Sequence, residues 1–100
     1  MSNYEPFCQM IVDTSKELTA KGFLSATGGN VSARIPSERA LAITPSNYDY
    51  NKMIPSDICV LDFDLHPLVG ERVPSVESAM HAAIYKVRPD VNAIIHTHQV

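Results

Sequence analysis

The chain has 100 residues, of which 45% are hydrophobic and 19% are charged, a balance typical of a globular domain and unlike that of a disordered segment. Its formal net charge is −3 with no basic cluster, so binding to nucleic acid or to an anionic membrane has no electrostatic support. No apolar run approaches the roughly 20 residues of a membrane helix, and the N-terminus lacks a basic signal-peptide region. We therefore expect a cytoplasmic protein in which Cys8 and Cys59 are buried thiols.

The first part of the chain predicts a helix followed by strands. Apolar residues recur at helical intervals from Glu5 to Lys21, and Gly22 is well placed to end that helix. The next segment, SATGGN, is a loop by composition. Alternating or β-branched residues then predict strands at 30–35 (NVSARI), 40–44 (ALAIT) and 57–64 (DICVLDFD).

The second part predicts a hairpin or short excursion over 65–74, then a helix and a last strand. Ser75 is a candidate N-cap, and the helix should end near Val87, because the residue before Pro89 disfavours helical backbone. We expect its apolar face to contain Val76, Met80, Ala83 and Val87, and its polar face Glu77, His81, Tyr85 and Arg88. With 93–98 (AIIHTH) as a strand, the order of elements indicates an α/β (α+β layered) domain whose mixed central sheet is flanked by helices.

Two histidines end the last predicted strand. His96 and His98 are two residues apart, so both side chains would project from the same face and form a bidentate platform for zinc or a similar metal. The alternative is one buried polar residue and one residue on a surface turn. Glu77 could reach such a metal or serve as a general base beside it, or could lie on a solvated helix face. His81, on the same helix, is more often a structural residue than a ligand.

Three short segments combine proline or glycine with hydroxyl or amide side chains. In TGGNVS (27–32), glycine lets backbone amides approach an oxyanion closely, although the P-loop lysine and the dinucleotide-binding spacing are both missing. ITPSNY (43–48) and VPSVE (73–77) each place a hydroxyl after a proline. Ser75 would donate to a phosphate or cap the helix, and each segment is also compatible with an ordinary turn.

Taken in order and spacing, TGGNVS, ITPS, PSVES and RPDVNAIIHTH resemble the class II aldolase/adducin family, nearest to its L-fuculose-phosphate aldolase-like zinc aldolases. The resemblance implies that residues 1–100 are the N-terminal part of a single class II aldolase-type domain. The family completes its zinc site with a further histidine, and assists its chemistry with a tyrosine, both of which would lie beyond Val100. We therefore expect a fragment of a longer protein, or a truncated product, that is inactive by itself.

The resemblance also implies roles for individual residues. His96 and His98 would bind one Zn²⁺ per subunit together with the missing histidine, and Glu77 would touch the resting metal and act as the catalytic acid/base. The residues expected to bind the substrate phosphate are Thr27, Gly29, Asn30, Ser46, Asn47 and Ser75. The family usually has a small residue at the position of Asn47 and a second serine at that of Val76, so the substrate or its phosphate contacts are expected to differ.

The activity implied by the resemblance is zinc-dependent cleavage of a sugar phosphate to dihydroxyacetone phosphate and an aldehyde, by a homo-oligomer that is a tetramer in the family. Glu77 favours this reaction over sugar-phosphate 4-epimerisation, because the epimerases tend to have aspartate there. A decarboxylase on the same scaffold stays open. A non-catalytic, adducin-like or truncated module is the further alternative, against which the HTH element and Glu77 argue.

Overall fold

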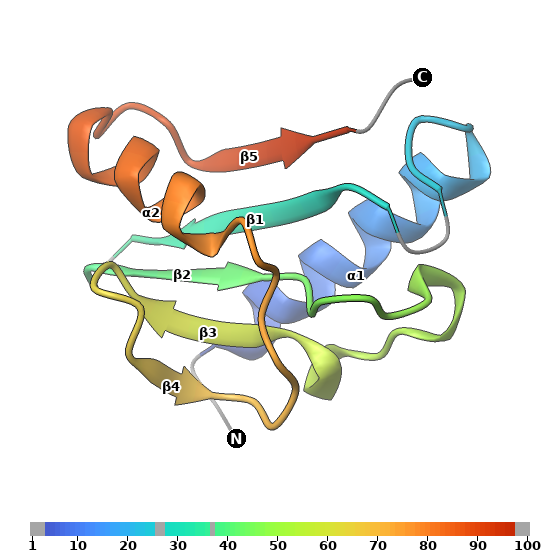
Figure 1. The fold of residues 1–100 in the computed structure, drawn as a ribbon, viewed down its shortest axis with the longest axis horizontal. Coiled ribbons are helices and arrows are strands. Elements are labelled where there is room, and N and C mark those ends of the chain that lie inside the picture. The colour runs from blue at the N-terminus through green and yellow to red at the C-terminus, as the bar shows by residue number, and fades with distance from the viewer. Residues whose placement is uncertain (1–3, 26–27, 37, 98–100) are drawn as a thin grey trace.

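The computed structural model of the chain describes residues 4–25, 28–36 and 38–97. Within these ranges a sheet carries one helix on each face (Figure 1). The helices are α1 (Glu5–Ala20) and α2 (Ser78–Val87), and two 3₁₀ turns lie at Tyr50–Lys52 and Pro55–Asp57. The strands are β1 (Asn30–Ile35), β2 (Ala40–Ile43), β3 (Cys59–Asp62), β4 (Pro67–Val69) and β5 (Ala93–His96).

The strand order is β4-β3-β2-β1-β5, and β3 and β4 form the predicted hairpin. This arrangement confirms the layered α/β architecture with a central sheet flanked by helices. The strand pairings among the described residues are antiparallel, so the parallel pairing that a mixed sheet requires is not among them. No helix in the described ranges is long and apolar enough to cross a membrane.

Helix α1 ends where the sequence predicts. Gly22 has a φ of +83°, the left-handed conformation that glycine adopts without steric cost. The N–H of Gly22 donates to the carbonyl of Thr19, and the N–H of Phe23 donates to that of Leu18. These two bonds form a Schellman motif, which satisfies carbonyl groups at the helix end and directs the chain back toward the sheet.

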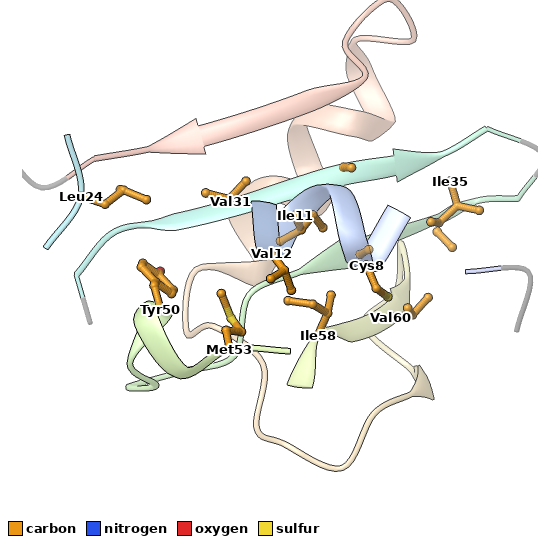
Figure 2. Packing of buried hydrophobic residues seen from close by; sticks show 13 residues of the cluster. Cys8, Ile11, Val12, Leu24, Val31, Ile35, Tyr50, Met53, Ile58 and Val60 are labelled. Carbon is orange, nitrogen blue, oxygen red and sulfur yellow. The ribbon is translucent and has the colours of Figure 1, made fainter. Parts of the chain in front are cut away.

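The hydrophobic core lies on both faces of the sheet. Between α1 and the sheet it contains Cys8, Ile11, Val12, Leu24, Val31, Ile35, Tyr50, Met53, Ile58 and Val60, among others (Figure 2). A second cluster on the α2 face contains Leu41, Ile43, Cys59, Leu61, Phe63, Ala82 and Tyr85. Both cysteines are buried and free, as predicted, and burial raises the pKa of each thiol to about 11.

Strand β1 presents different chemistry to the two helices. Val31, Ala33 and Ile35 join the apolar cluster under α1. The alternate residues Asn30, Ser32 and Arg34 face α2, where each makes side-chain hydrogen bonds to that helix or to the turn after it. Helix α2 therefore contacts β1 through polar groups that are hidden from solvent.

This polar contact sets the orientation of α2. The buried side of the helix consists of Ser78, His81, Ala82 and Tyr85. The residues expected on its apolar face, Val76, Met80, Ala83 and Val87, are exposed. This is the reverse of the usual orientation of an amphipathic helix, and it arises because β1 presents hydrogen-bonding groups to α2. The helix also begins at Ser78 with Glu77 as its N-cap residue, rather than at the predicted N-cap Ser75.

Candidate functional site

Four chain segments that are distant in the sequence meet at one end of the sheet. Asn30, at the start of β1, lies directly opposite His96, at the end of β5 (Figure 1). The chain leaving β2 stays beside β1, because the N–H of Thr44 donates to the carbonyl of Val31 over 3.1 Å. An isolated bridge then joins Pro45 to Pro74. The glycine loop, both proline–hydroxyl segments and the histidine strand are thereby assembled at the same end.

The two proline–hydroxyl segments hold each other through backbone bonds. The N–H of Ser46 donates to the carbonyl of Val73 over 2.8 Å, and the N–H of Ser75 donates to that of Thr44 over 3.1 Å. The Ser75 hydroxyl oxygen accepts the N–H of Glu77 over 3.2 Å. Because these backbone amides are already used, Ser46 and Ser75 can offer a ligand their hydroxyl groups but not their N–H groups.

The glycine loop is fixed by a close approach to β5. Gly29 has a φ of +82°, and a β-carbon built on it would lie 2.7 Å from the carbonyl oxygen of His96. The Tyr50 hydroxyl donates to the carbonyl of Gly29 from the other side. Glycine is therefore required here both for its conformation and for its lack of a side chain. Thr27, also predicted to bind phosphate, lies outside the described residues.

Asn47 has the backbone conformation that a glycine would adopt easily. Its φ is +53°, in the left-handed region, where asparagine is one of the better-tolerated residues. Asn47 therefore allows the same turn as the small residue that the family usually has at this position. It adds an exposed carboxamide next to Ser46.

The structure brings together two of the three predicted metal-site residues. The carboxylate of Glu77, at the start of α2, contacts Nδ1 of His96 at the end of β5. The two side chains are 27% and 35% exposed respectively, so a solute can reach both. His98 lies outside the described residues, and within those that are described no cluster of three or more metal-ligating side chains forms. His66, the fourth histidine of the chain, is exposed and pairs with Asp62.

Sequence reasoning missed a buried chain of polar side chains behind the site. His81 contacts Asn30 through Nε2 and Ser32 through Nδ1, and the Ser32 hydroxyl contacts that of Tyr85. The available signal was combined spacing: His81 and Tyr85 are one helical turn apart, and Asn30 and Ser32 share one face of a strand. This spacing becomes informative only when α2 is known to pack against β1, and local sequence patterns do not reveal that packing.

Comparison with solved structures places this arrangement in the class II aldolase fold. The structure of an L-fuculose 1-phosphate aldolase superposes with a TM-score of 0.90 and 36% sequence identity, covering 100% of this chain and 46% of that chain. The family model of the Class II Aldolase and Adducin N-terminal domain matches residues 9–100. The chain belongs to the class II aldolase and adducin family, as its motifs predict.

The curated relatives of this chain include proteins named as aldolases and proteins named as dehydratases. A 5-methylthioribulose-1-phosphate/5-deoxyribulose-1-phosphate aldolase of Escherichia coli O45:K1 is 44% identical over 92% of this chain and 42% of its own length. A methylthioribulose-1-phosphate dehydratase of Xanthomonas campestris pv. campestris is 34% identical over 90% of this chain and 41% of its own length. The chain thus spans less than half the length of these relatives.

Proposed function

We propose that the intact protein is a lyase that acts on a ketose 1-phosphate, with aldol cleavage to dihydroxyacetone phosphate and an aldehyde as its reaction. The observation that carries the proposal is the contact between Glu77 and His96 at the end of the sheet where the hydroxyl-bearing loops converge. The similar proteins named above act, by their names, on ketose 1-phosphates, which supports the same substrate class here.

The donor groups suit a borderline divalent metal such as zinc. Glu77 supplies a carboxylate oxygen and His96 an imidazole nitrogen; the two side chains are in contact, and each is partly exposed. We propose that these two residues hold the metal together with His98. When bound, the metal supplies a Lewis acid that polarises the substrate carbonyl.

Glu77 is proposed as the acid/base. When the carbon–carbon bond breaks, the hydroxyl group on the carbon that becomes the aldehyde loses its proton, and the protonated form of Glu77 would give a proton to the carbon of the three-carbon product. In the reverse direction the carboxylate of Glu77 would remove that proton from the carbon. The contact with His96 and the position of Glu77 at the N-terminus of α2 fix the carboxylate before the substrate arrives. This pre-orientation favours proton transfer, because little side-chain freedom is left to lose.

The loops around Gly29 and Ser75 are proposed to bind the phosphate. Asn30 and the hydroxyl groups of Ser46 and Ser75 provide hydrogen-bond donors at the same end of the sheet as Glu77. Thr27 and Asn47 are proposed to add further contacts to the phosphate. Binding of the phosphate there would orient the sugar carbons toward Glu77, and this orientation lowers the entropic cost of reaching the transition state.

Substitution of Glu77 by glutamine tests the proposal. We expect turnover of 5-deoxyribulose 1-phosphate by the intact protein to fall roughly 10²- to 10⁴-fold, the usual contribution of a general acid/base, with metal content retained. The exposed Glu71 gives a matched control, because Glu71→Gln removes the same charge outside the site. Survival of turnover in Glu77→Gln would show that another group transfers the proton.

Dehydration is the second candidate, supported by the relative named as a methylthioribulose-1-phosphate dehydratase. Product analysis separates the two reactions. Aldol cleavage gives two carbon fragments, one of them dihydroxyacetone phosphate, whereas dehydration gives one product that retains every carbon and has lost one water. A homo-oligomeric assembly stays a prediction, which the solution mass of the intact protein will test.

A further inference from the structure

The polar chain between α2 and β1 is buried completely enough to need internal hydrogen bonds. His81, Ser32 and Asn30 are 0%, 1% and 3% exposed. His81 Nδ1 lies 2.6 Å from the Ser32 hydroxyl oxygen, which lies 2.7 Å from that of Tyr85. His81 Nε2 contacts the carboxamide oxygen of Asn30. This chain of side chains runs from Tyr85 on α2 to Asn30 at the start of β1, within the proposed phosphate site.

The direction of these bonds follows from what each atom can do. A carboxamide oxygen only accepts, so Nε2 of His81 must carry the hydrogen that it donates to Asn30. Burial is the main cause that lowers the pKa of His81 to about 4; Glu77 opposes this shift and His96 adds to it. In the neutral ring Nδ1 is an acceptor, so Ser32 donates to it, and Ser32 in turn accepts the hydrogen of Tyr85.

The consequence for Asn30 concerns the other half of its carboxamide. Because the oxygen is held by His81, the NH₂ group points away from His81, and none of the hydrogen bonds seen among the described residues uses it. An amide that can rotate offers an incoming ligand an oxygen or a nitrogen. An amide fixed in this way offers two N–H donors and no acceptor, which suits a phosphate dianion.

We propose that His81 is a positioning residue that orients the Asn30 carboxamide so that its NH₂ group donates to the phosphate of the substrate. This inference rests on the proposed function, since it assumes that the Gly29–Asn30 turn binds phosphate. In this proposal His81 does not contact the substrate, and it acts by orienting the NH₂ group of Asn30, which does. Ser32 and Tyr85 complete the chain by providing a hydrogen-bond partner for Nδ1, the other ring nitrogen of His81.

The tautomer of His81 can be measured without any substitution. In the intact protein labelled with ¹⁵N-histidine, long-range ¹H–¹⁵N correlation spectra distinguish a ring protonated at Nε2 from one protonated at Nδ1. We expect His81 to carry its hydrogen at Nε2. A neutral ring protonated at Nδ1 would overturn the proposal, because Asn30 would then have to donate to His81 and turn its oxygen toward the ligand.

Two amide variants test the functional consequence. His81→Gln places an amide nitrogen near the former Nε2 and keeps a donor for Asn30, whereas His81→Asn places its amide near the former Nδ1 and leaves Asn30 without that donor. With inorganic phosphate as the probe in titration calorimetry, we expect binding within about threefold of the unchanged protein for His81→Gln. For His81→Asn we expect binding about tenfold weaker, the usual cost of losing one hydrogen bond to a charged group.

The outcomes separate the two proposals. Phosphate binding by the unchanged protein that is the same in both variants would overturn the positioning role while leaving the proposed function intact. Failure of the unchanged protein to bind phosphate, or a ketose 1-phosphate, would contradict the proposed function itself. Equal thermal unfolding temperatures of the two variants would show that a difference in phosphate binding is not a difference in folding.

Discussion

The backbone of Gly29 lies so close to the carbonyl of His96 that a β-carbon on residue 29 would stand 2.7 Å from that oxygen. Carbon and oxygen do not approach this closely without a bond. Cδ2 of Leu24 would lie 2.5 Å from the same β-carbon, so the obstacles are one side chain, which can move, and one backbone carbonyl, which cannot move without β5. We expect Gly29→Ala to push β5 away from the glycine loop. It should thereby displace His96 and destabilise the fold in the same step.

Gly22 provides the matched control for Gly29→Ala. Its φ of +83° matches the +82° of Gly29, but no described atom lies within 4 Å of the point where a β-carbon on residue 22 would stand. Gly22→Ala should therefore cost only the conformational strain, about 1 kcal/mol in the free energy of unfolding, measured by urea denaturation. Gly29→Ala should cost roughly 1–3 kcal/mol more, the usual range for overpacking. Equal losses would show that the approach to His96 is not tight.

Asn47 offers a second test of left-handed backbone, in a turn of the proposed phosphate site. Asn47→Gly should change the free energy of unfolding by less than about 0.5 kcal/mol, because glycine adopts a φ of +53° freely. Asn47→Val should cost roughly 1–3 kcal/mol, because β-branched residues are strained there. Urea denaturation of both variants is the measurement. A valine variant as stable as the glycine variant would mean that the turn has relaxed to another conformation.

Arg34 ties the end of α2 to the turn that precedes β5. Its guanidinium donates to the carbonyls of Val91, Tyr85 and Arg88 over 2.8–2.9 Å, and lies 4.9 Å from the centre of the Tyr85 ring. Lysine keeps the charge but cannot supply this planar set of donors. We expect Arg34→Lys to lower the free energy of unfolding by about 2–3 kcal/mol, from the loss of charge-assisted bonds.

Arg39 is the control for Arg34. It also lies over an aromatic ring, 5.5 Å from the centre of Phe63, but its side chain is exposed. Arg39→Lys should therefore change the free energy of unfolding by less than about 0.5 kcal/mol, as most surface substitutions do. Equal stability of Arg34→Lys and Arg39→Lys in thermal and urea unfolding would contradict the structural role given to Arg34.

Local patterns in the sequence were sufficient to predict most elements and the loops of the site. Helix α1 and its end follow from apolar periodicity and Gly22, and β1 follows from its alternation. Glu77 and His96, which the sequence assigns to one site, lie in contact, while their roles there stay predictions. These features succeed because each depends on residues close together in the chain or on a helix that leads directly into a strand.

The orientation of α2 could not be predicted in the same way. Its residues divide into an apolar side and a side with His81 and Tyr85, and the usual rule buries the apolar side. The rule fails because Ser32 and Asn30 on β1 provide hydrogen-bond partners for the polar side. Since β1 and α2 are far apart in the sequence, only the pairing of strands and helices in three dimensions makes this solution visible. The apolar side of α2 is left exposed as a result.

The buried carboxylate of Asp57 predicts a dependence of stability on pH. Burial would raise its pKa, but the N–H of Ile54 and the guanidinium of Arg72, whose Nε lies 2.7 Å from Oδ1, together hold the pKa below its usual range. The folded state therefore binds this proton less readily than the unfolded state. The stabilisation is complete above the unfolded pKa of about 4 and is lost as the pH falls through the lower, folded value.

Asp57→Asn isolates this contribution, because asparagine has the same shape and does not titrate. At pH 7 the variant should be about 1–3 kcal/mol less stable than the unchanged protein in urea denaturation, from the loss of charge-assisted bonds. That difference should shrink as the pH is lowered below about 4. Asp64→Asn removes a carboxylate from an exposed pair with Lys86 at 3.3 Å, and should change stability little at any pH. A difference for Asp57→Asn that does not shrink in acid would mean that the charge of the Asp57 carboxylate is not the source of the stabilisation.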